Sequence, residues 1–243
     1  MDTTLYITGA GVSAESGIPT FRGEDGYWTI GSRNYTPQEM ATRAMYSRQP
    51  REFLKWYYQR FVAYRHHGPN MIHRWLADKN LITQNIDGLD GKAGNTDYIS
   101  IHGRIDKVTV FHTQGEPVQV MDAPWDAVDE DCLEDSLMSL FRIDGHPEMN
   151  RSLKPLVLLF DEYYTDLYRM SEAEQRMAEA ERMVFMGTSF SVNITSIALQ
   201  YAHMRSIPVE VVDPKPVRIP YPLVTYHEMT GSEYVRMMED VHA

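Results

Sequence analysis

The sequence predicts an α/β protein with a Rossmann-like, three-layer parallel sheet and a smaller inserted domain. A short apolar run, Leu5–Ile7, leads into a glycine-rich turn. Further short apolar segments alternate with predicted helices along the chain, which is typical of a sheet covered by helices on both faces. Polar residues follow several of these segments, at the strand ends where parallel sheets gather their ligands.

The glycine turn follows the first predicted strand. Gly9, Gly11 and Ala14 have the G-x-G-x-x-[GA] spacing found in nucleotide-binding turns. Gly9 permits a tight turn, Gly11 lets the backbone approach a pyrophosphate, and the helix start is expected to direct free N–H groups at the anion. Ser16–Pro19 predicts that this helix ends after about one turn. The spacing alone also fits a plain connecting loop.

Aromatic and basic residues come directly after the turn. Phe21 suits a wall against a flat ring, and Arg22 suits a clamp on charge. The segment 23–35 is rich in Gly, Asp, Asn and Ser and carries Trp28. It predicts either a loop that closes over a ligand or a surface connection.

A helix is predicted from residue 50 or 51 to about residue 64. Phe53, Tyr57, Arg60 and Tyr64 recur at i, i+4, i+7 and i+11 and therefore share one face. The arginine on this aromatic face either covers ring surface with its side chain or grips an acidic group through a forked hydrogen bond.

Two predicted strands then end in polar side chains. After a short helix over 70–79, the strand over 81–85 leads to Gln84, Asn85 and Asp87, and the strand over 98–101 leads to His102. Such residues either cap turns or line a ligand site. The imidazole has an ordinary pKa near 6.5, which suits a general base at neutral pH, although most single histidines are structural.

The carboxyl-terminal part repeats the strand–turn–helix pattern. A capping box at Ser171–Glu174 predicts a helix that runs to about residue 182. A strand over 183–186 leads to the turn Gly187–Ser189, which suits a phosphate or ribose. A helix over 193–205 follows, and a strand over 209–212 ends at Asp213.

Composition narrows the possible classes of protein. The 243 residues are 43% hydrophobic and carry a net charge of −11, which suits one large domain and argues against a nucleic-acid surface. Basic protein partners would be attracted instead. No apolar run is long enough for a membrane span and no signal peptide is recognisable, so we expect a cytoplasmic protein. The single Cys132 excludes an internal disulfide and a multi-cysteine zinc site.

Four blocks, in this order, resemble the signatures of the sirtuins, the NAD-dependent protein lysine deacylases: Gly9–Arg22, Thr83–Asp87, Ile101–Gly103 and Gly187–Ser189. The resemblance implies NAD and an acyl-lysine protein as substrates. It implies that His102 is the general base for a ribose hydroxyl, that Asn85 orients a ribose hydroxyl or water, and that Asp87 binds the nicotinamide carboxamide. It also implies NAD contacts from Gly9, Ala10, Gly11, Ser13, Glu15, Phe21, Arg22, Trp28, Gln84, Asn85, Ile86, Asp87, Gly187, Thr188, Ser189 and Asp213.

The resemblance extends to the acyl substrate. Tyr57 and Arg60, shortly before a Pro-Asn step at 69–70, resemble the Tyr-x-x-Arg pair of sirtuins that remove succinyl or malonyl groups. Val157 and Phe160 lie in a segment that resembles the lining of the acyl-lysine tunnel, or they belong simply to a buried strand. The chain has Asp213 where the family usually has asparagine.

The segment 109–153 departs from the family. Sirtuins usually carry two Cys-x-x-Cys pairs here, and this chain has none, so we predict no structural zinc and a run of solvated acids over Asp129–Asp135. The large part is predicted over 1–30, 70–108 and 154–243, and insertions over 31–69 and 109–153. We expect the insert's own apolar residues to hold it: Val118, Val120, Trp125, Val128, Leu133, Leu137, Leu140 and Phe141.

The altered insert leaves other functions open. A sirtuin-like NAD hydrolase or ADP-ribosyltransferase is one alternative, and a non-catalytic NAD or ADP-ribose sensor is another. Retention of His102, Asn85 and Asp87 together argues against the sensor, because a pure binder has no need of a base. A monomer is favoured over an oligomer.

Overall fold

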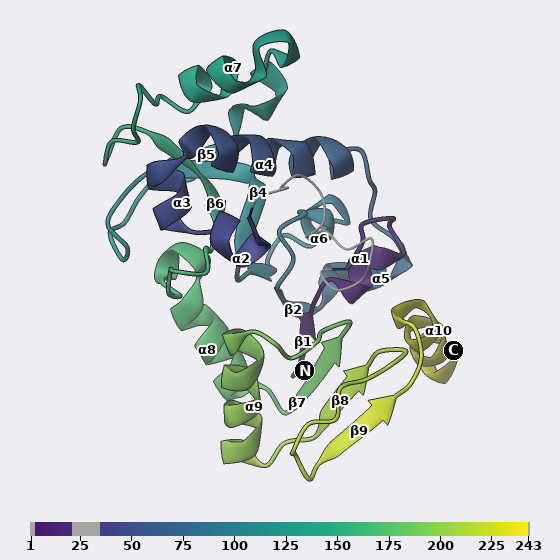
Figure 1. Ribbon diagram of the computed structural model, residues 1–243. Coiled ribbons are helices and arrows are strands. Elements are labelled where there is room, and N and C mark those ends of the chain that lie inside the picture. Colours follow the sequence, from purple (N-terminus) through teal and green to yellow (C-terminus); the bar gives the residue numbers. More distant parts are fainter. Residues whose placement is uncertain (1–2, 21–34, 243) are drawn as a thin grey trace.

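A parallel sheet forms the centre of the larger part of the molecule. The computed structural model describes residues 3–20 and 35–242 (Figure 1). Within them, six strands run parallel in the order β3-β2-β1-β7-β8-β9. Their bounds are Thr4–Thr8 for β1, Asn80–Thr83 for β2, Ile99–Ser100 for β3, Arg182–Met186 for β7, Val209–Val212 for β8 and Val224–His227 for β9. The predicted Rossmann-like α/β class is confirmed.

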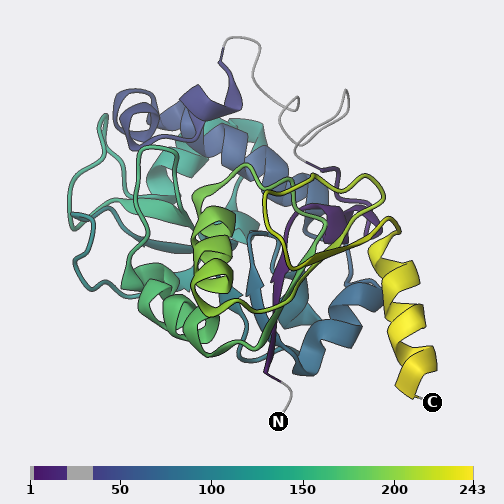
Figure 2. The same cartoon turned by 90° about the horizontal axis from the view of Figure 1, so that it is seen from below.

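Helices cover both faces of this sheet (Figure 2). Along β1, Leu5 and Ile7 face one side and pack with α8 and α9, while Tyr6 faces the other and packs with α5 and α10. This alternation follows from the two-residue period of a strand. The helices are α8 (Met170–Glu179), α9 (Asn193–Arg205), α5 (Met71–Trp75) and α10 (Gly231–His242).

The strand order puts the predicted motifs at one edge. Strand β1 has β2 on one side and β7 on the other, with Thr8 level with both Thr83 and Met186. The first glycine turn therefore leaves the sheet beside the second, at the point where the strand order reverses. Open parallel sheets bind their ligands at such a switch point.

A smaller module stands above this edge in Figure 1. Its antiparallel sheet has the order β5-β4-β6. The predicted domain boundaries at 108/109 and 153/154 fall inside β4 and at the start of β6, and the division into domains stays a prediction. The module contains β4 (Gly103–Val110), β5 (Met121–Asp122), β6 (Leu153–Val157), α2 (Pro37–Met40), α3 (Arg43–Arg48), α4 (Pro50–Tyr64) and α7 (Leu133–Leu140).

The module has its own aromatic core. Trp125, Leu137 and Phe141 are buried in it as expected, and the Trp125 indole donates to the Ile105 carbonyl at 2.7 Å. Val128, Leu133 and Leu140 pack partly against this cluster. The expectation for Val120 is wrong, because its side chain is 42% exposed, and Val118 lies outside the cluster.

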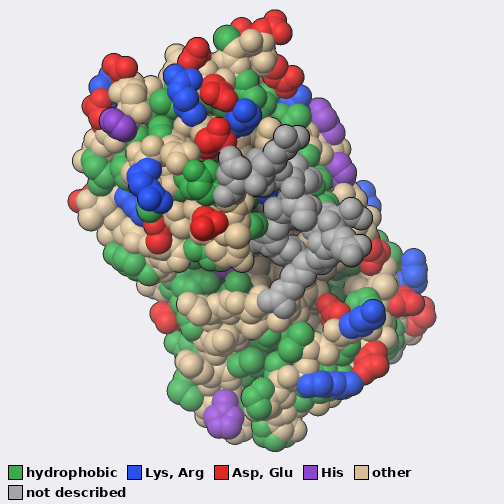
Figure 3. Space-filling model, viewed as in Figure 1, with side chains coloured by type: hydrophobic (Ala, Val, Ile, Leu, Met, Phe, Trp, Pro, Cys, Tyr) green, Lys and Arg blue, Asp and Glu red, His purple; other side chains and the backbone are tan. Residues whose placement is uncertain are grey.

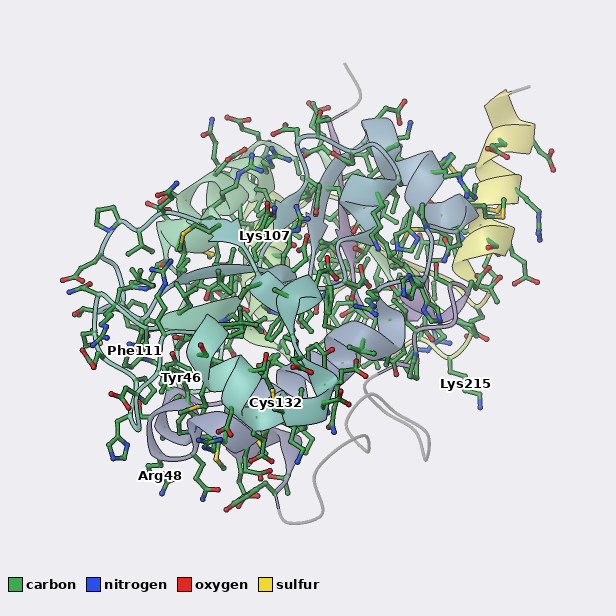
Figure 4. The ribbon with its side chains drawn as sticks, turned by 90° about the horizontal axis from the view of Figure 1, so that it is seen from above. Tyr46, Arg48, Lys107, Phe111, Cys132 and Lys215 are labelled. Atoms are coloured by element: carbon green, nitrogen blue, oxygen red, sulfur yellow. The ribbon has the colours of Figure 1, made fainter. Side chains whose placement is uncertain are left out.

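Long-range contacts fasten the module further. Tyr46 packs edge-on against Phe111, and its hydroxyl donates to the Leu153 carbonyl at 2.6 Å. The two aromatic residues are labelled close together in Figure 4. Cys132, the single cysteine, is exposed beside α7.

A buried charge cluster joins β6 and the segment after it to α3. The Lys154 ammonium lies 3.2 Å from the Glu162 carboxylate, and both side chains are almost fully buried. Arg43 reaches the same carboxylate at 3.0 Å. Asp161 accepts hydrogen bonds from the backbone N–H groups of Arg43 and Ala44 at the start of α3. Burial lowers the pKa of Lys154, and the neighbouring Glu162 opposes that effect.

Two predictions about the carboxyl-terminal half need correction. Helix α8 begins at Met170 with Arg169 at its N-cap and no side-chain cap, so the predicted capping box is wrong. The Ser171 N–H instead donates to the Asp166 carboxylate. The predicted elements also omitted β9 and α10.

Short elements complete the described chain. They are α1 (Gly11–Ala14), α6 (Leu89–Lys92) and the 3-10 helices η1 (Leu76–Asp78), η2 (Pro124–Ala127), η3 (Glu130–Cys132) and η4 (Asp166–Tyr168).

Acidic side chains collect at the top of the module in Figure 3, around η3 and α7. Most of Asp129–Asp135 is exposed there, with Glu134 only partly so. None of the described helices combines the length and apolar character needed to cross a membrane.

Candidate active site

The two glycine turns interlock. The Gly11 N–H donates to the Gly187 carbonyl at 2.9 Å. A Cβ on Gly11 would lie 2.5 Å from the Gly187 Cα, and one on Gly187 would lie 2.7 Å from the Gly11 Cα. Gly187 also has a φ of +59°, which glycine adopts without strain. These positions therefore need glycine so that one turn can approach the other.

The start of α1 offers fewer free donors than expected. The N–H groups of Gly11, Val12 and Ser13 already donate to protein carbonyls, so the prediction that they point free at an anion is wrong. Among the described residues, the N–H groups of Ala10, Thr188 and Ser189 have no protein acceptor. Backbone donors of this kind at a glycine-rich edge suit an anion.

The end of β2 is bonded into the first turn. The Asn85 amide donates to the Gly9 carbonyl and to the Ser13 hydroxyl, both at 3.1 Å. Ser13 in turn donates to the Asp87 carboxylate at 2.7 Å. Fully buried His73 also approaches Ser13, with its Nε2 3.5 Å from the Ser13 Oγ. This network holds the amide and the carboxylate in fixed positions.

The neighbouring Gln84 links the second turn to the histidine. Its amide nitrogen donates to the Thr8 carbonyl at 3.0 Å and to the Thr188 hydroxyl at 3.1 Å. Its backbone carbonyl lies 2.9 Å from Nδ1 of His102. The carbonyl can only accept, so Nδ1 carries the proton and Nε2 carries the lone pair.

His102 stays neutral under ordinary conditions. Burial lowers the pKa of its imidazole to about 4, although the hydrogen bond to Gln84 raises it. The Nε2 atom lies 3.0 Å from the Tyr164 hydroxyl. The backbone carbonyl of His102 accepts from the Leu158 N–H at 3.0 Å. At pH 7 the ring is an unprotonated base held in one tautomer.

A pocket of about 320 Å³ opens between this edge and the module. Ala10, Ser13 and Ile18 from the first segment line it together with Asn85 and Asp87. Arg60, Phe61 and Tyr64 of α4 line it from the module. Charged residues also line it: Arg65, Lys92, Arg104, Asp106 and Asp126. Pockets of this size with a few convergent polar groups are typical small-molecule sites.

Comparison with known proteins agrees with this geometry. Residues 9–194 match the sequence profile of the Sir2 family. The chain belongs to the Sir2 family. An NAD-dependent protein deacylase 1 of Caldanaerobacter subterraneus subsp. tengcongensis is 30% identical over 98% of this chain and 93% of the relative. An NAD-dependent protein deacylase of Leptospira interrogans is 31% identical over 81% of this chain and 75% of the relative.

Solved structures of the Sir2 family share the fold. A Sir2 homologue in complex with NAD has a TM-score of 0.73 and is 26% identical, over 99% of this chain and 90% of the other. A mutant Sir2 homologue in complex with ADP-ribose also has a TM-score of 0.73 and is 26% identical, over 98% and 92%.

The remaining predicted NAD contacts of this Sir2-family chain are dispersed. Exposed Glu15 accepts from Ser232 at the start of α10, and Asp213 accepts from the Lys215 N–H. Neither lines the pocket, whereas Ile86 does. Phe21, Arg22 and Trp28 lie outside the described residues.

The predicted acyl-group contacts are also divided. Arg60 lines the pocket, while Tyr57 is buried against Phe53 and Trp56 in the module core. Val157 is buried in β6, and Phe160 is 53% exposed. Val157 and Phe160 are not among the residues that line the pocket.

Two residues at the site carry no signal in the Sir2 blocks. Tyr164 follows β6 in a loop and meets His102 only through the fold. Arg104 lines the pocket and forms a forked ion pair with Asp106. Neither has a spacing that singles it out, so the sequence pattern offers no way to find them. In the part of the chain that the structure describes, no three His, Cys, Asp or Glu side chains gather as metal ligands.

Proposed function

We infer that this protein is an NAD-dependent protein lysine deacylase. The inference is supported by membership of the Sir2 family and by relatives called NAD-dependent protein deacylases. The observation that carries it is a neutral His102, with its lone pair on Nε2, at the same sheet edge as Asn85 and Asp87. A binding protein would not need an unprotonated imidazole there.

The site fits NAD on its own features. The free N–H groups of the two glycine turns suit the pyrophosphate, and the adjoining pocket has room for a ring. When bound, NAD supplies the ADP-ribose that accepts the acyl group and the nicotinamide that leaves. A net charge of −11 favours basic protein partners over nucleic acid.

The described residues then divide the work. Asp87, fixed by Ser13, binds the carboxamide, and Asn85 orients a ribose hydroxyl or a water molecule. His102 accepts the proton of a ribose hydroxyl at Nε2, and its Nδ1–H stays on the Gln84 carbonyl. Ile18, Ile86 and Phe61 form an apolar part of the pocket wall, which excludes water from the ribose carbon that loses nicotinamide.

His102→Ala tests this assignment. Loss of a general base lowers the rate by about 10²–10⁴-fold, so deacylation of an acyl-lysine peptide should fall by that amount while NAD affinity stays within a few-fold. In the wild type, the acid limb of kcat/KM should lie near the imidazole pKa of about 4. His203→Ala, an exposed histidine on α9, is the matched control.

Mass spectrometry of the products separates the alternatives. A deacylase yields O-acyl-ADP-ribose, whereas a hydrolase yields ADP-ribose alone. Wild-type turnover in His102→Ala would remove this histidine from the mechanism.

We also propose that the acyl chain enters the pocket beside Arg60, and that this site favours an acidic chain such as succinyl or malonyl. Arg60 is 1% exposed, its Nη1 donates to the Trp56 carbonyl at 2.9 Å, and its guanidinium lies over the Trp56 ring. The ring and the carbonyl hold the cation at the pocket wall, where a carboxylate would form charge-assisted hydrogen bonds.

An acyl-peptide panel tests the preference. Arg60→Met should lower kcat/KM for succinyl and malonyl peptides by about 10–100-fold, the value of one or two hydrogen bonds to a charged group, with little change for acetyl. Arg51→Met removes an exposed arginine of the same helix that pairs with Asp135, away from the pocket lining, and should leave the preference unchanged. Equal preference in wild type and Arg60→Met would sink the proposal.

A further inference from the structure

Both ring nitrogens of His102 are engaged in the described structure. Nδ1 donates to the Gln84 carbonyl, so Nε2 is an acceptor, and the Tyr164 hydroxyl 3.0 Å away is the donor to it. These are the hydrogen bonds that the imidazole makes within residues 3–20 and 35–242. The orientation of the ring therefore depends on one carbonyl and one phenol.

Packing and burial hold the Tyr164 side chain in this position. Its ring lies nearly parallel to the imidazole, at an interplanar angle of 20° and a centroid distance of 6.0 Å. It also packs against the apolar cluster beneath α8 and α9. Burial raises the pKa of Tyr164 to about 12, although a backbone hydrogen bond from Ile194 lowers it. The phenol thus keeps its proton, and remains a donor, at every pH at which the enzyme would work.

The contact lies on the atom that the reaction needs. A hydroxyl that gives its proton to His102 must reach the Nε2 lone pair, and Tyr164 occupies that lone pair. Among the described residues, no charged side chain contributes to the pKa shift of this imidazole, and the Tyr164 phenol is the titratable group that contacts it.

We propose that Tyr164 is a positioning residue, which holds the His102 imidazole by stacking and by donating to Nε2 until the substrate hydroxyl takes its place. The proposal rests on the assignment of His102 as the base. A hydrogen bond donated to the neutral ring favours the neutral form, so the contact also keeps the base unprotonated between turnovers.

Tyr164→Phe tests the hydroxyl and keeps the ring. In NMR spectra, we expect the Nε2 resonance of His102 to move to the chemical shift of a ring nitrogen whose lone pair accepts no hydrogen bond. We also expect the pH midpoint of the His102 titration to move to a higher value. The acid limb of kcat/KM should follow, and kcat should fall about threefold to tenfold, the effect of one lost hydrogen bond, with KM for NAD unchanged within twofold. Tyr163→Phe is the matched control, because that neighbouring tyrosine is 58% exposed and donates to the Gln114 carbonyl.

The NMR measurement needs no catalytic turnover, so it tests the role of Tyr164 independently of whether the protein is a deacylase. An unchanged Nε2 resonance and acid limb in Tyr164→Phe would overturn the positioning role even if His102→Ala abolished deacylation. A free lone pair on Nε2 in the wild type would overturn it without any variant. Tyr164→Leu, which also removes the stacked ring, should lower kcat further than Tyr164→Phe, and an equal kcat would refute the stacking.

Discussion

The parallel sheet and the smaller module position their residues by different means. In the sheet, main-chain turns place the site: Gly9 and Gly11 follow β1 and Gly187 follows β7, with the two turns in backbone contact. In the module, contacts between side chains and distant segments position the residues. The Tyr46 hydroxyl, for example, donates a hydrogen bond to the Leu153 carbonyl. Short motifs encode the first arrangement, whereas the second depends on contacts between residues far apart in the chain.

The largest expected effect comes from breaking the charge cluster of the module, which tests whether side-chain contacts hold this region together. Glu162→Ala leaves Lys154 and Arg43 without their shared carboxylate. Removing one partner of a buried pair costs about 3–5 kcal/mol, and we expect that loss in the free energy of unfolding from denaturant titration. Glu148→Ala, which removes an exposed pair with Arg151 in the same module, should cost less than about 1 kcal/mol. Similar values for both variants would show that the cluster does not hold the module.

That cluster also shows where prediction from sequence ends. Helices α4 and α9 and strands β1, β7 and β8 were predicted because apolar periodicity and glycine turns are local signals. The predicted capping box at 171–174 failed because the N-cap of α8 is Arg169, in a left-handed conformation, two residues before Ser171. No local pattern marks the pairing of Lys154 with Glu162, and none brings Tyr164 to His102.

The interlocked turns test the sheet side of the comparison. In Gly11→Ala, the new Cβ would lie 2.5 Å from the Gly187 Cα, and backbone cannot give way as a side chain does. We expect a loss of about 1–3 kcal/mol in unfolding free energy, typical of overpacking, and a loss of NAD binding in calorimetry. Gly68→Ala, where a Cβ meets nothing within 4 Å, should leave both unchanged. NAD binding retained by Gly11→Ala would show that the turns need not touch.

The smallest expected effect concerns metal. The chain has one cysteine, and we predict that the module folds without zinc, on its aromatic core and charge cluster. Incubation with a chelator should shift the melting temperature by less than about 1 °C, since a bound structural metal adds its binding free energy to folding. A drop of several degrees in the melting temperature, reversed by added zinc, would contradict the prediction. It would show that a metal, and not side-chain contacts alone, holds the module together.

The segment after β6 has a mechanical consequence for the base. Within a few residues it is bonded to the backbone of His102 through Leu158, to Ala41 of the module through Phe160, and to the imidazole through Tyr164. A tilt of the module against the sheet would pull on all three attachments together. The position of the imidazole is therefore tied to that of the module through one short stretch of chain, as well as to the sheet edge through the Gln84 carbonyl.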